Sequence, residues 1–444
     1  MKHKIKYLVL FLFFILLADY GWSERVYSLV SRVNVRQEGS LTSPVITRLR
    51  HNRWVRVLKK NGDWIKIRMP DDTEGFVSAK LMTSNWIKIL KDERKLMLMN
   101  DEKVVREFST ALGFNPKDDK IKLGDGCTPE GRFYICEIIK KPKPTATYGP
   151  VSLRISYPNV EDARRGLKNK LISKAQYLAI VRAIHRGVLP PQNTTLGGSI
   201  KIHGGTGGVS SDWTLGCVAM KDPDITSLFA QIPEKPVMVE VYRSRKQERL
   251  LNSVTYVNDT TLNEAERLMR KGCKYTSKAI SIIPVSFPFG DFDRSIGVCT
   301  DVAIRSLRGA GIDLQALLYE DIVLHPGRYP KIARPNTNID HRRTRNLKIY
   351  FDHHAKILTN LPPAKSPKAY LPGDIVLMDT GISNGTIYDH IGIVSSRKSD
   401  SGIPLVINLW TVGCTLNEME LLNGDYPEIV GHYRLFHPFY YDAL

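Results

Sequence analysis

A glycine-rich stretch near the middle of the chain, IHGGTGGVSSDWTLGCVAM (202–220), contains one histidine and one cysteine, His203 and Cys217. A buried strand would favour branched apolar residues, so this composition indicates irregular backbone that serves a purpose other than packing. A cysteine attacks as its thiolate, and it needs a neighbouring base and backbone amides directed at the oxyanion that forms. Gly216 would let the backbone of residues 215–217 approach a substrate carbonyl closely. The pair therefore indicates acyl transfer through a thioester.

A second cysteine, Cys299, precedes a helical pattern in GVCTDVAIRSLRGAGIDLQ (297–315). The partial positive charge at a helix N-terminus lowers a thiol pKa and favours the thiolate. A nucleophile in this position needs a histidine on a following strand and a polar residue that orients the ring. HIGIV supplies His390 at the start of one predicted strand, and PLVIN supplies Asn408 on the next. The placement is typical of a papain-like cysteine hydrolase.

Three ordered motifs within residues 86–242 resemble the L,D-transpeptidase family: GDGCTPEGRF (124–133), SYPN (156–159) and the His-Gly to Thr-Leu-Gly-Cys element. The resemblance implies a β-sandwich in which Cys217 is the nucleophile and His203 the base. The substrate would be a peptidoglycan stem peptide, attacked at the carbonyl of its diamino acid. The terminal D-alanine leaves, and an amine of a second stem or water resolves the acyl-enzyme. The residues that the resemblance assigns to the oxyanion hole or to substrate binding are Gly204, Thr214, Gly216 and Tyr157.

This segment departs from the family at two positions. Leu215 stands where the family often has histidine, and Ala219 stands where it often has arginine or asparagine. The alternative interpretation is that Cys217 is an inert buried cysteine and His203 a satisfied core histidine. The chain would then be a wall-binding adaptor without activity.

Residues from about 259 to 444 carry further ordered motifs, among them FPFGD (287–291), NIDHRR (338–343), PGDIV (372–376) and GHYR (431–434). Together with the segments around Cys299 and His390, they resemble a bacterial family of largely uncharacterised proteins related to the NlpC-type papain-like peptidases and amidases. The resemblance implies an α+β domain in which Cys299, His390 and Asn408 form a triad. Its relatives commonly have histidine at the position of Asn408, although asparagine is an accepted third residue in papain-like enzymes.

A zinc site is the rival interpretation for this last region. Five histidines are available there: His341, His353, His354, His390 and His432. Their order shows none of the short paired spacings of metal motifs apart from the adjacent pair at 353–354, whose side chains diverge. We therefore expect no metal and no other cofactor. Asp340, Arg342 and Arg343 form either a binding cluster or a structural ion-pair network, and the network is the preferred interpretation.

The elements that must position these residues fall into three units. Residues 25–84 show short alternating runs separated by turns, and they resemble a bacterial SH3-like domain through NVR, the G-x-W hairpin at 62–64 and GFV at 75–77. Strand-like runs dominate 86–242, with one helix predicted from a capping box at Ser173 and Gln176 to Gly187. His185 is expected on the solvated last turn of that helix. A third unit opens with a predicted capping-box helix from Thr261, and consecutive strands come later, which indicates α+β structure.

The predicted organisation is a signal peptide (1–23), an SH3-like domain (24–84), an L,D-transpeptidase-like domain (85–242), a polar linker (243–258) and a papain-like domain (259–444). The predicted fold class is a multidomain protein with an all-β SH3-like barrel, a mostly-β L,D-transpeptidase sandwich and an α+β papain-like domain. A length of 444 residues is compatible with about three domains. The apolar run of the leader falls short of a bilayer span, so we expect cleavage and no stable membrane span, with an uncleaved anchor as the alternative.

The formal charge of +19 favours polyanionic surroundings such as the acidic polymers of a cell envelope. Nucleic acid is disfavoured because no compact basic stripe with interleaved aromatic residues is present. Export permits disulfides, and Cys127 and Cys136 are close enough in sequence to pair.

The sequence therefore predicts an exported peptidoglycan-remodelling enzyme of the periplasm or cell wall. It would bind stem peptides and reach the wall through its SH3-like domain. An L,D-transpeptidase would be combined with a second cysteine amidase or peptidase. The enzymatic alternative is an L,D-carboxypeptidase or an amidase that releases wall-linked protein.

Overall fold

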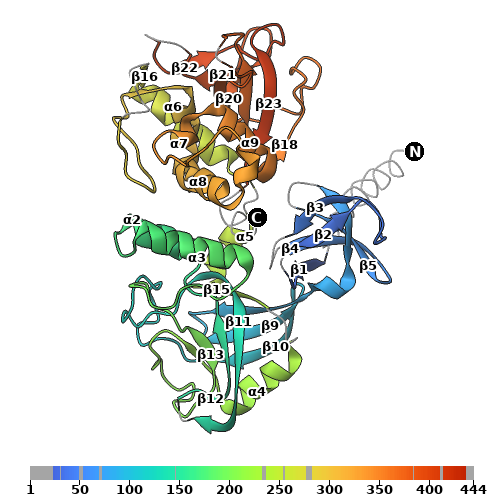
Figure 1. Ribbon diagram of the computed structural model, residues 1–444, viewed down its shortest axis with the longest axis vertical. Helices are drawn as coiled ribbons and strands as arrows, with labels where there is room; N and C mark the ends of the chain where they lie inside the picture. Colours follow the sequence, from blue (N-terminus) through green and yellow to red (C-terminus); the bar gives the residue numbers. More distant parts are fainter. Residues whose placement is uncertain are drawn as a thin grey trace, which may run out of the picture.

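The computed structural model describes residues 24–436 except 31, 50–53, 70–72, 146, 233–236, 254–255, 277–282, 384 and 411–413. The predicted signal peptide lies outside the described residues. Among the described residues, no helix combines the length and apolar character needed to cross a membrane. Figure 1 shows three units, with the C-terminal one above the central one and the N-terminal one to the side.

The first unit is a seven-stranded antiparallel barrel-like sheet in the order β3-β2-β6-β5-β4-β1-β7. Alternating burial along its strands places Val33, Val35, Ile65 and Ile67 in one apolar core. Gly62 takes the left-handed conformation (φ +57°) at the β4–β5 turn, as the Asn61-Gly62 signal predicts. The elements are β1 (Arg25–Ser28), β2 (Val33–Arg36), β3 (Val45–Leu49), β4 (Trp54–Asn61), β5 (Trp64–Arg68), β6 (Glu74–Ser78), η1 (Ala79–Leu81) and β7 (Met82–Thr83).

The second unit is an eight-stranded sheet in the order β10-β9-β8-β15-β11-β12-β13-β14. The long β11 pairs with β15 through its first residues and with β12 further along, so it joins the two halves that enclose the core. The strands are β8 (Asn85–Leu90), β9 (Lys95–Asn100), β10 (Lys103–Ser109), β11 (Gly131–Thr145), β12 (Gly149–Ile155), β13 (Lys201–His203), β14 (Val218–Ala219) and β15 (Met238–Tyr242). The helices are α2 (Val160–Lys168), α3 (Lys174–Arg186) and α4 (Asp222–Gln231).

Helix α3 confirms the sequence prediction at both ends. Its N-cap Ser173 and Gln176 form the expected capping box, and Gly187 closes it in the left-handed conformation. The prediction for His185 is wrong. Its ring lies 5.1 Å from that of His325 in the third unit, because α3 faces a domain interface rather than solvent.

The segment predicted to be a linker contains a helix, α5 (Arg245–Ser253). Arg245 pairs with Glu93 at 2.5 Å, and Lys88 pairs with Glu248 at 2.8 Å, so α5 is fastened to the second unit. The charged residues that suggested a solvated linker therefore form ion pairs with the sheet.

The third unit packs helices on one face of a six-stranded antiparallel sheet in the order β18-β23-β19-β20-β21-β22. Along β19, Ile375 and Leu377 face the helices, whereas Val376 and Met378 join a second core on the opposite face. The helices are α6 (Asn258–Lys271), α7 (Cys299–Gly309), α8 (Leu314–Leu324), η2 (Pro326–Arg328), η3 (Asp340–Arg342) and α9 (Thr344–His354). The strands are β16 (Lys274–Tyr275), β17 (Ile296–Gly297), β18 (Lys356–Ile357), β19 (Ile375–Asp379), β20 (His390–Lys398), β21 (Pro404–Asn408), β22 (Asn417–Met419) and β23 (Glu428–Arg434).

Helix α6 begins earlier than predicted. Its N-cap is Val257, which makes no side-chain cap, so the capping box expected from Thr261 does not form; Thr261 is buried inside the helix. The predicted C-terminal end of α6 is confirmed, because Gly272 caps the helix in the left-handed conformation.

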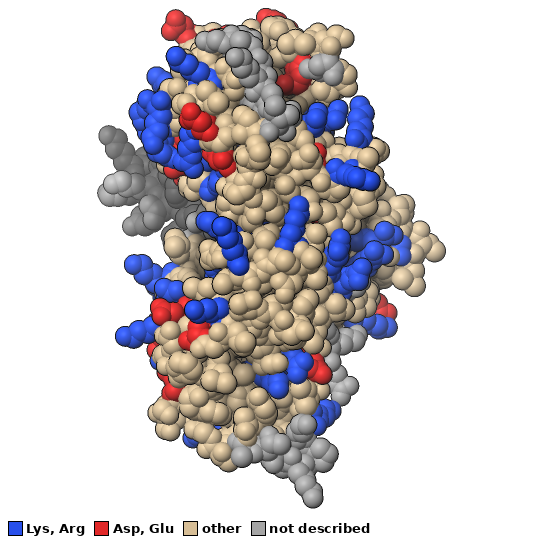
Figure 2. Space-filling view, turned by 60° about the vertical axis from the view of Figure 1, so that its left-hand side comes forward, with Lys and Arg blue, Asp and Glu red and all other residues tan. Residues whose placement is uncertain are grey.

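A buried ion pair joins the second and third units. Arg164 of α2 contacts both carboxylate oxygens of Glu320 of α8 at 2.8 Å, and the Tyr177 hydroxyl of α3 donates to the same carboxylate. The rings of Phe287 and Tyr177 pack at 6.0 Å beside it. The two units therefore meet through a specific, water-poor interface. Lys and Arg predominate over Asp and Glu on the face shown in Figure 2, in keeping with the net charge of +19.

Candidate active sites

His203 and Cys217 come from neighbouring parallel strands of the second unit. His203 ends β13 and pairs with Ala219 of β14, while Cys217 immediately precedes β14. Residues opposite each other in a sheet face the same side, and so do residues two apart along a strand. The register therefore brings Cys217 to the face that carries His203. The Cys217 Sγ lies 3.7 Å from the Ser199 carbonyl oxygen.

The His203 ring is held in an aromatic enclosure. It is 1% exposed, and its Nδ1 lies 2.5 Å from the Gly204 carbonyl oxygen. Because a carbonyl only accepts, Nδ1 carries the proton and Nε2 keeps its lone pair. Tyr148 and Trp213 contact the ring edge-on at 5.1 and 5.9 Å. Burial lowers the pKa of His203, so a neutral imidazole is available as a base.

Thr214 organises the backbone of the cysteine loop. Its hydroxyl donates to the Cys217 carbonyl at 2.7 Å and accepts from the Gly216 amide at 3.1 Å. In this conformation the Gly216 amide is thus engaged by Thr214 rather than turned towards a substrate oxyanion. Gly216 has φ +128°, and a Cβ there would lie 2.6 Å from the Cys127 carbonyl oxygen. Glycine is therefore required by the close approach of the two loops.

Gly204 and Tyr157, which the family resemblance also assigned to this site, are buried. A Cβ on Gly204 would lie 2.1 Å from Asp222 Oδ1, so this glycine permits the contact that holds the following turn. Tyr157 is fully buried, and its hydroxyl donates to the Leu196 carbonyl at 2.9 Å.

The GDGCTPEG motif (124–131) packs against the loop that carries Cys217. Asp125 accepts from the amides of Ile121, Lys122 and Cys127, and Glu130 pairs with buried Lys91 at 3.0 Å. The Asp212 carboxylate accepts hydrogen bonds from the Arg94 side chain at 2.7 Å and from the Leu112 amide at 2.8 Å. This second anchor, which the sequence analysis missed, fixes the residue next to Trp213.

Burial raises the pKa of the Cys217 thiol above its usual value. At rest, a thiol and a neutral imidazole therefore share this face of the sheet, and not the preformed thiolate expected from the sequence. Such a pair acts by proton transfer to the base as the sulfur attacks.

The second constellation lies where three elements of the third unit meet. Cys299 begins α7, His390 begins β20 and Asn408 ends β21. The His390 Nε2 lies 3.1 Å from Asn408 Oδ1, and Asn408 Nδ2 donates to the Val406 carbonyl at 3.1 Å. Asn408 thus accepts from Nε2 and leaves Nδ1 as the acceptor. Helix α7 packs against β20, and the Cys299 thiol interacts with the backbone of Ile391, the residue after His390.

The Cys299 pKa is not low overall, although the backbone amide of Thr300 at the start of the helix does lower it as expected. Burial raises the pKa of this thiol to about 12, and the negative charge of Asp301 in the first turn adds to the increase. Asp301 is held by Arg342 at 2.9 Å, with both side chains 1% exposed. Burial also lowers the pKa of His390 to about 4. Of Asp340, Arg342 and Arg343, Arg342 thus forms a buried structural ion pair, and its partner is Asp301.

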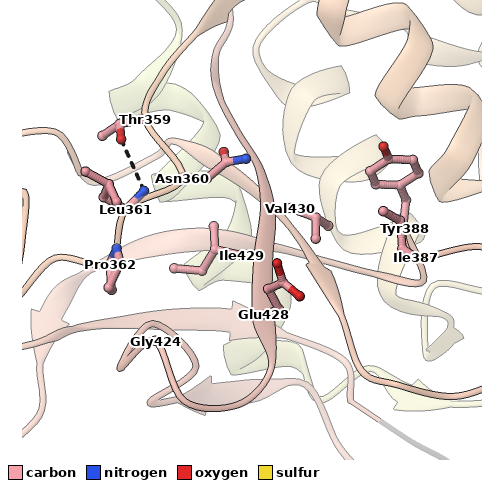
Figure 3. Close-up of a pocket in the computed structure, with 10 residues that line it drawn as sticks. All are labelled: Thr359, Asn360, Leu361, Pro362, Ile387, Tyr388, Gly424, Glu428, Ile429 and Val430. Carbon is pink, nitrogen blue, oxygen red and sulfur yellow. Dashed lines mark hydrogen bonds between the residues drawn. The ribbon is translucent and has the colours of Figure 1, made fainter.

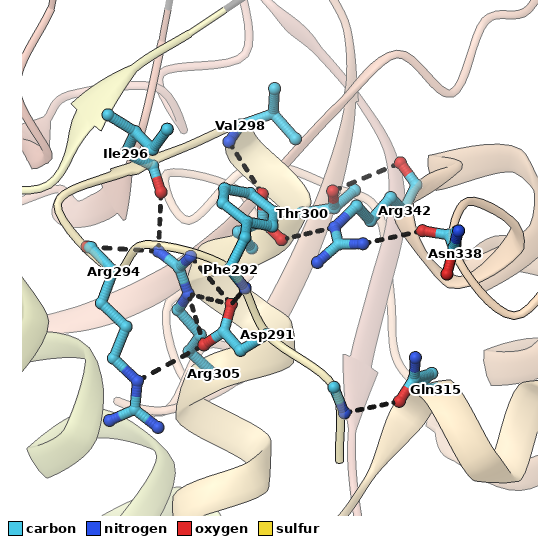
Figure 4. A network of polar contacts seen from close by, with 12 residues as sticks. Asp291, Phe292, Arg294, Ile296, Val298, Thr300, Arg305, Gln315, Asn338 and Arg342 are labelled. Atoms are coloured by element: carbon cyan, nitrogen blue, oxygen red, sulfur yellow. Dashed lines mark hydrogen bonds and ion pairs between the residues drawn. The ribbon is translucent and has the colours of Figure 1, made fainter. Parts of the chain in front are cut away.

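Figure 4 shows a polar network that includes Val298 and Thr300, on either side of Cys299 in the sequence. Arg305 of α7 binds Asp291 of the FPFGD motif at 2.9 Å, and the Gly290 amide donates to Gln315 of α8 at 2.8 Å. The Val298 amide donates to Asp301 at 3.0 Å. These contacts join the segment before Cys299 to helices α7 and α8 and so fix the start of α7.

The third unit also contains a groove of about 480 Å³ (Figure 3). Ile387 and Tyr388, just before His390, form one side, while Leu361 and Pro362 form the other. Glu428 is its charged lining residue. The groove is open to solvent, and its lining residue Tyr388 precedes the proposed base by two positions in the sequence.

The five histidines of the zinc interpretation do not converge. His354 binds Asp321, His432 binds Asp374 and His390 binds Asn408. Within the part of the chain that the structure describes, no group of three or more His, Cys, Asp or Glu is placed to hold a metal ion. All six cysteines are free thiols, so Cys127 and Cys136 do not pair.

Three family models match separate parts of the chain. They are a bacterial SH3 domain (31–83), an L,D-transpeptidase catalytic domain (84–241) and a domain of unknown function, DUF1287 (262–435). The uncharacterized protein YijF of Escherichia coli (strain K12) is 40% identical over 159 residues, which cover 35% of this chain and 71% of YijF.

A comparison with solved structures found matches of low identity and low TM-score. A variant of the helical cell shape determining protein Pgp2 from Campylobacter jejuni is 23% identical, with a TM-score of 0.26, and the match covers 36% of this chain and 48% of that one. Bd1075 from Bdellovibrio bacteriovorus is 15% identical, with a TM-score of 0.28 and coverage of 80% and 94%. NlpC2 from Trichomonas vaginalis is 12% identical, with a TM-score of 0.25 and coverage of 94% and 99%.

The chain therefore belongs to the same family as YijF, and it joins a bacterial SH3 domain, an L,D-transpeptidase catalytic domain and a DUF1287 domain in one polypeptide.

Proposed function

We propose that this chain is an exported peptidoglycan-remodelling enzyme that transfers an acyl group from one stem peptide to another through Cys217. The observation that supports this most strongly is the placement of Cys217 and His203 on one face of adjacent strands in an L,D-transpeptidase catalytic domain. The proposed location is the periplasm or cell wall, where the SH3 domain would bind the wall.

The proposed reaction uses only the residues described above. The Cys217 Sγ attacks the carbonyl carbon of the diamino acid as its proton passes to His203 Nε2. The bond to the D-alanine nitrogen then breaks, and His203 returns the proton to the leaving amine. An amine of a second stem attacks the thioester, forms the cross-link and releases the thiol. Attack by water at the last step would give an L,D-carboxypeptidase instead.

A labelled disaccharide tetrapeptide tests the proposal. Cross-linked dimers that disappear in Cys217→Ala support transfer, whereas trimmed monomer alone would favour the carboxypeptidase. Release of protein from labelled walls would favour the amidase. An absence of every product, in a folded protein whose thiols label no faster than in denaturant, would favour the non-catalytic adaptor that Leu215 and Ala219 suggest.

The second site supports a separate candidate function, a papain-like cysteine amidase or peptidase. The His390–Asn408 contact and the position of Cys299 at the helix start favour it. The groove lined by Ile387 and Tyr388 would hold its substrate. Profiling of digested walls after incubation with Cys299→Ala and Cys217→Ala variants separates the products of the two sites.

A further inference from the structure

A lysine lies on the same strand face as the proposed base. Lys201 begins β13, two residues before His203, so both side chains point to one side of the sheet. Its Nζ lies 4.0 Å from the centre of the Tyr148 ring, and the same ring contacts His203 at 5.1 Å. The β13–β14 register, extended by one residue, places Cys217 directly opposite Lys201. The cation, the base and the nucleophile therefore lie on one face of two adjacent strands, and Tyr148 contacts the first two.

Burial makes this charge effective. Lys201 is 8% exposed, and an ionic contact in such a water-poor place is stronger than one at the surface. Three influences on the pKa of the Cys217 thiol are the largest. Burial raises this pKa, whereas a backbone hydrogen bond from Lys201 and the positive charge of Lys201 lower it. Arg154 of β12 pairs with Lys201 across the sheet and is itself bound to Glu137 at 3.0 Å. The positive field at Cys217 thus comes from a fixed strand of the scaffold.

An acyl donor brings a negative group to this place. In a stem peptide that ends in D-alanine, one carbon separates the scissile nitrogen from the terminal carboxylate. When the scissile carbonyl is at Cys217, that carboxylate lies within reach of a cation mounted on the neighbouring strand. A lysine ammonium binds carboxylates through charge-assisted hydrogen bonds.

We propose that the Lys201 ammonium binds the C-terminal carboxylate of the stem peptide and so selects donors that end in a free D-amino acid. This inference rests on the proposed function of the Cys217 site. It makes Lys201 a specificity-determining residue. Lys201 lies on β13, and the neighbouring strand β14 carries Ala219, where the family often has a polar residue. Tyr148 holds the ammonium in place before the substrate arrives.

Binding measurements separate this inference from turnover. The full chain carrying Cys217→Ser is titrated by calorimetry with disaccharide tetrapeptide that ends in a carboxylate or in a carboxamide. We expect the carboxylate to bind about 10- to 100-fold more tightly, the range that a hydrogen bond to a charged group gives. In C217S/K201Q the two ligands should bind equally, at the affinity of the carboxamide. C217S/K201R should recover part of the preference.

Lys103→Gln is the matched control, because Lys103 is exposed on β10 of the same sheet. It should leave the preference unchanged. Equal weakening of both ligands in C217S/K201Q, or no preference in C217S, would overturn the inference. Thermal melting of each variant shows whether it is folded, and the Lys201→Arg variant retains the charge if glutamine is not tolerated. Loss of turnover with the preference intact would count against the proposed function and not against this assignment.

Discussion

The Nε2 atom of His390 lies 3.1 Å from Oδ1 of Asn408, at the junction of the third domain's central strands. Both residues are buried. The Trp410 ring packs edge-on against the His390 ring, with the ring centres 4.6 Å apart. The contact fixes the imidazole tautomer, so that Nδ1 can accept a proton from a thiol.

Replacing Asn408 with alanine should therefore slow the chemistry of Cys299 by about 10- to 100-fold, because the ring loses its orienting acceptor. The measurement is the rate at which Cys299 reacts with an activity-based thiol probe at neutral pH. Asn408→His should retain more reactivity, since histidine can also bond to Nε2. Asn417→Ala is the control, because Asn417 lies opposite Asn408 on β22 and is exposed. Equal loss in both alanine variants would contradict the assignment.

Alkylation of Cys299 should be slow at neutral pH and rise continuously to pH 10. The physical reason is burial, which raises the pKa of this thiol to about 12. Iodoacetamide labelling followed by peptide mass spectrometry gives the rate at each pH, with the denatured chain as reference. A plateau below pH 8 would show a preformed thiolate and would reject the resting state described here.

The stability of the third domain should fall as the pH drops from about 6.5 towards 4, partly because of His341. Its ring is 1% exposed, neither nitrogen has a hydrogen-bond partner in the described structure, and burial lowers its pKa well below the usual value. The unfolded chain then binds more protons than the folded chain, so stability rises with pH across this window and is lost below it.

His341→Phe should flatten this pH dependence, because it removes the group that must stay neutral. Urea midpoints at pH 4.5 and pH 7.5 provide the comparison. His353→Phe is the control, since His353 is exposed at the end of α9. An unchanged difference between the two midpoints in His341→Phe would contradict the prediction.

Removing one side of the buried Arg164–Glu320 pair should destabilise the contact between the second and third domains by about 3–5 kcal/mol, because the other charge stays buried without its partner. Arg164→Met is measured by urea unfolding and by protease sensitivity at the interface. The double variant Arg164→Met/Glu320→Leu should lose less free energy of unfolding than Arg164→Met alone. Lys60→Met removes an exposed pair with Glu24 and should behave like the parent chain. Additive losses would show that the two side chains are not coupled.

Local signals allowed much of this architecture to be predicted from the sequence. The Asn61-Gly62 hairpin, the Ser173 capping box and the three-domain order follow from patterns within a few residues. Long-range packing accounts for the errors. His185 was expected to be solvated because the sequence does not show that α3 lies against the third unit, where His185 contacts His325. The segment 245–253 was expected to be a linker because its partners, Lys88 and Glu93, lie about 150 residues away in the sequence.

The electrostatics of the two sites also depended on long-range structure. A helix start suggested a low thiol pKa at Cys299, but the burial of its sulfur could not be read from the motif. At the first site, the alternation IKIH placed Lys201 on the face of His203, so a search for period-two neighbours of the base would have found it. Nothing in the linear order indicated that Tyr148 and Trp213 would enclose the ring.

The most direct test of the account is the fate of Cys217 after mixing with disaccharide tetrapeptide, followed by intact-protein mass spectrometry. The account predicts a mass increase equal to the disaccharide tripeptide acyl group, located on the peptide that contains Cys217 and absent from Cys217→Ala. It also predicts that His203→Ala forms this adduct at least about 100-fold more slowly, since the base is lost. An adduct that forms equally well without Cys217, or a folded chain that turns over the substrate while Cys217 is replaced, would contradict it.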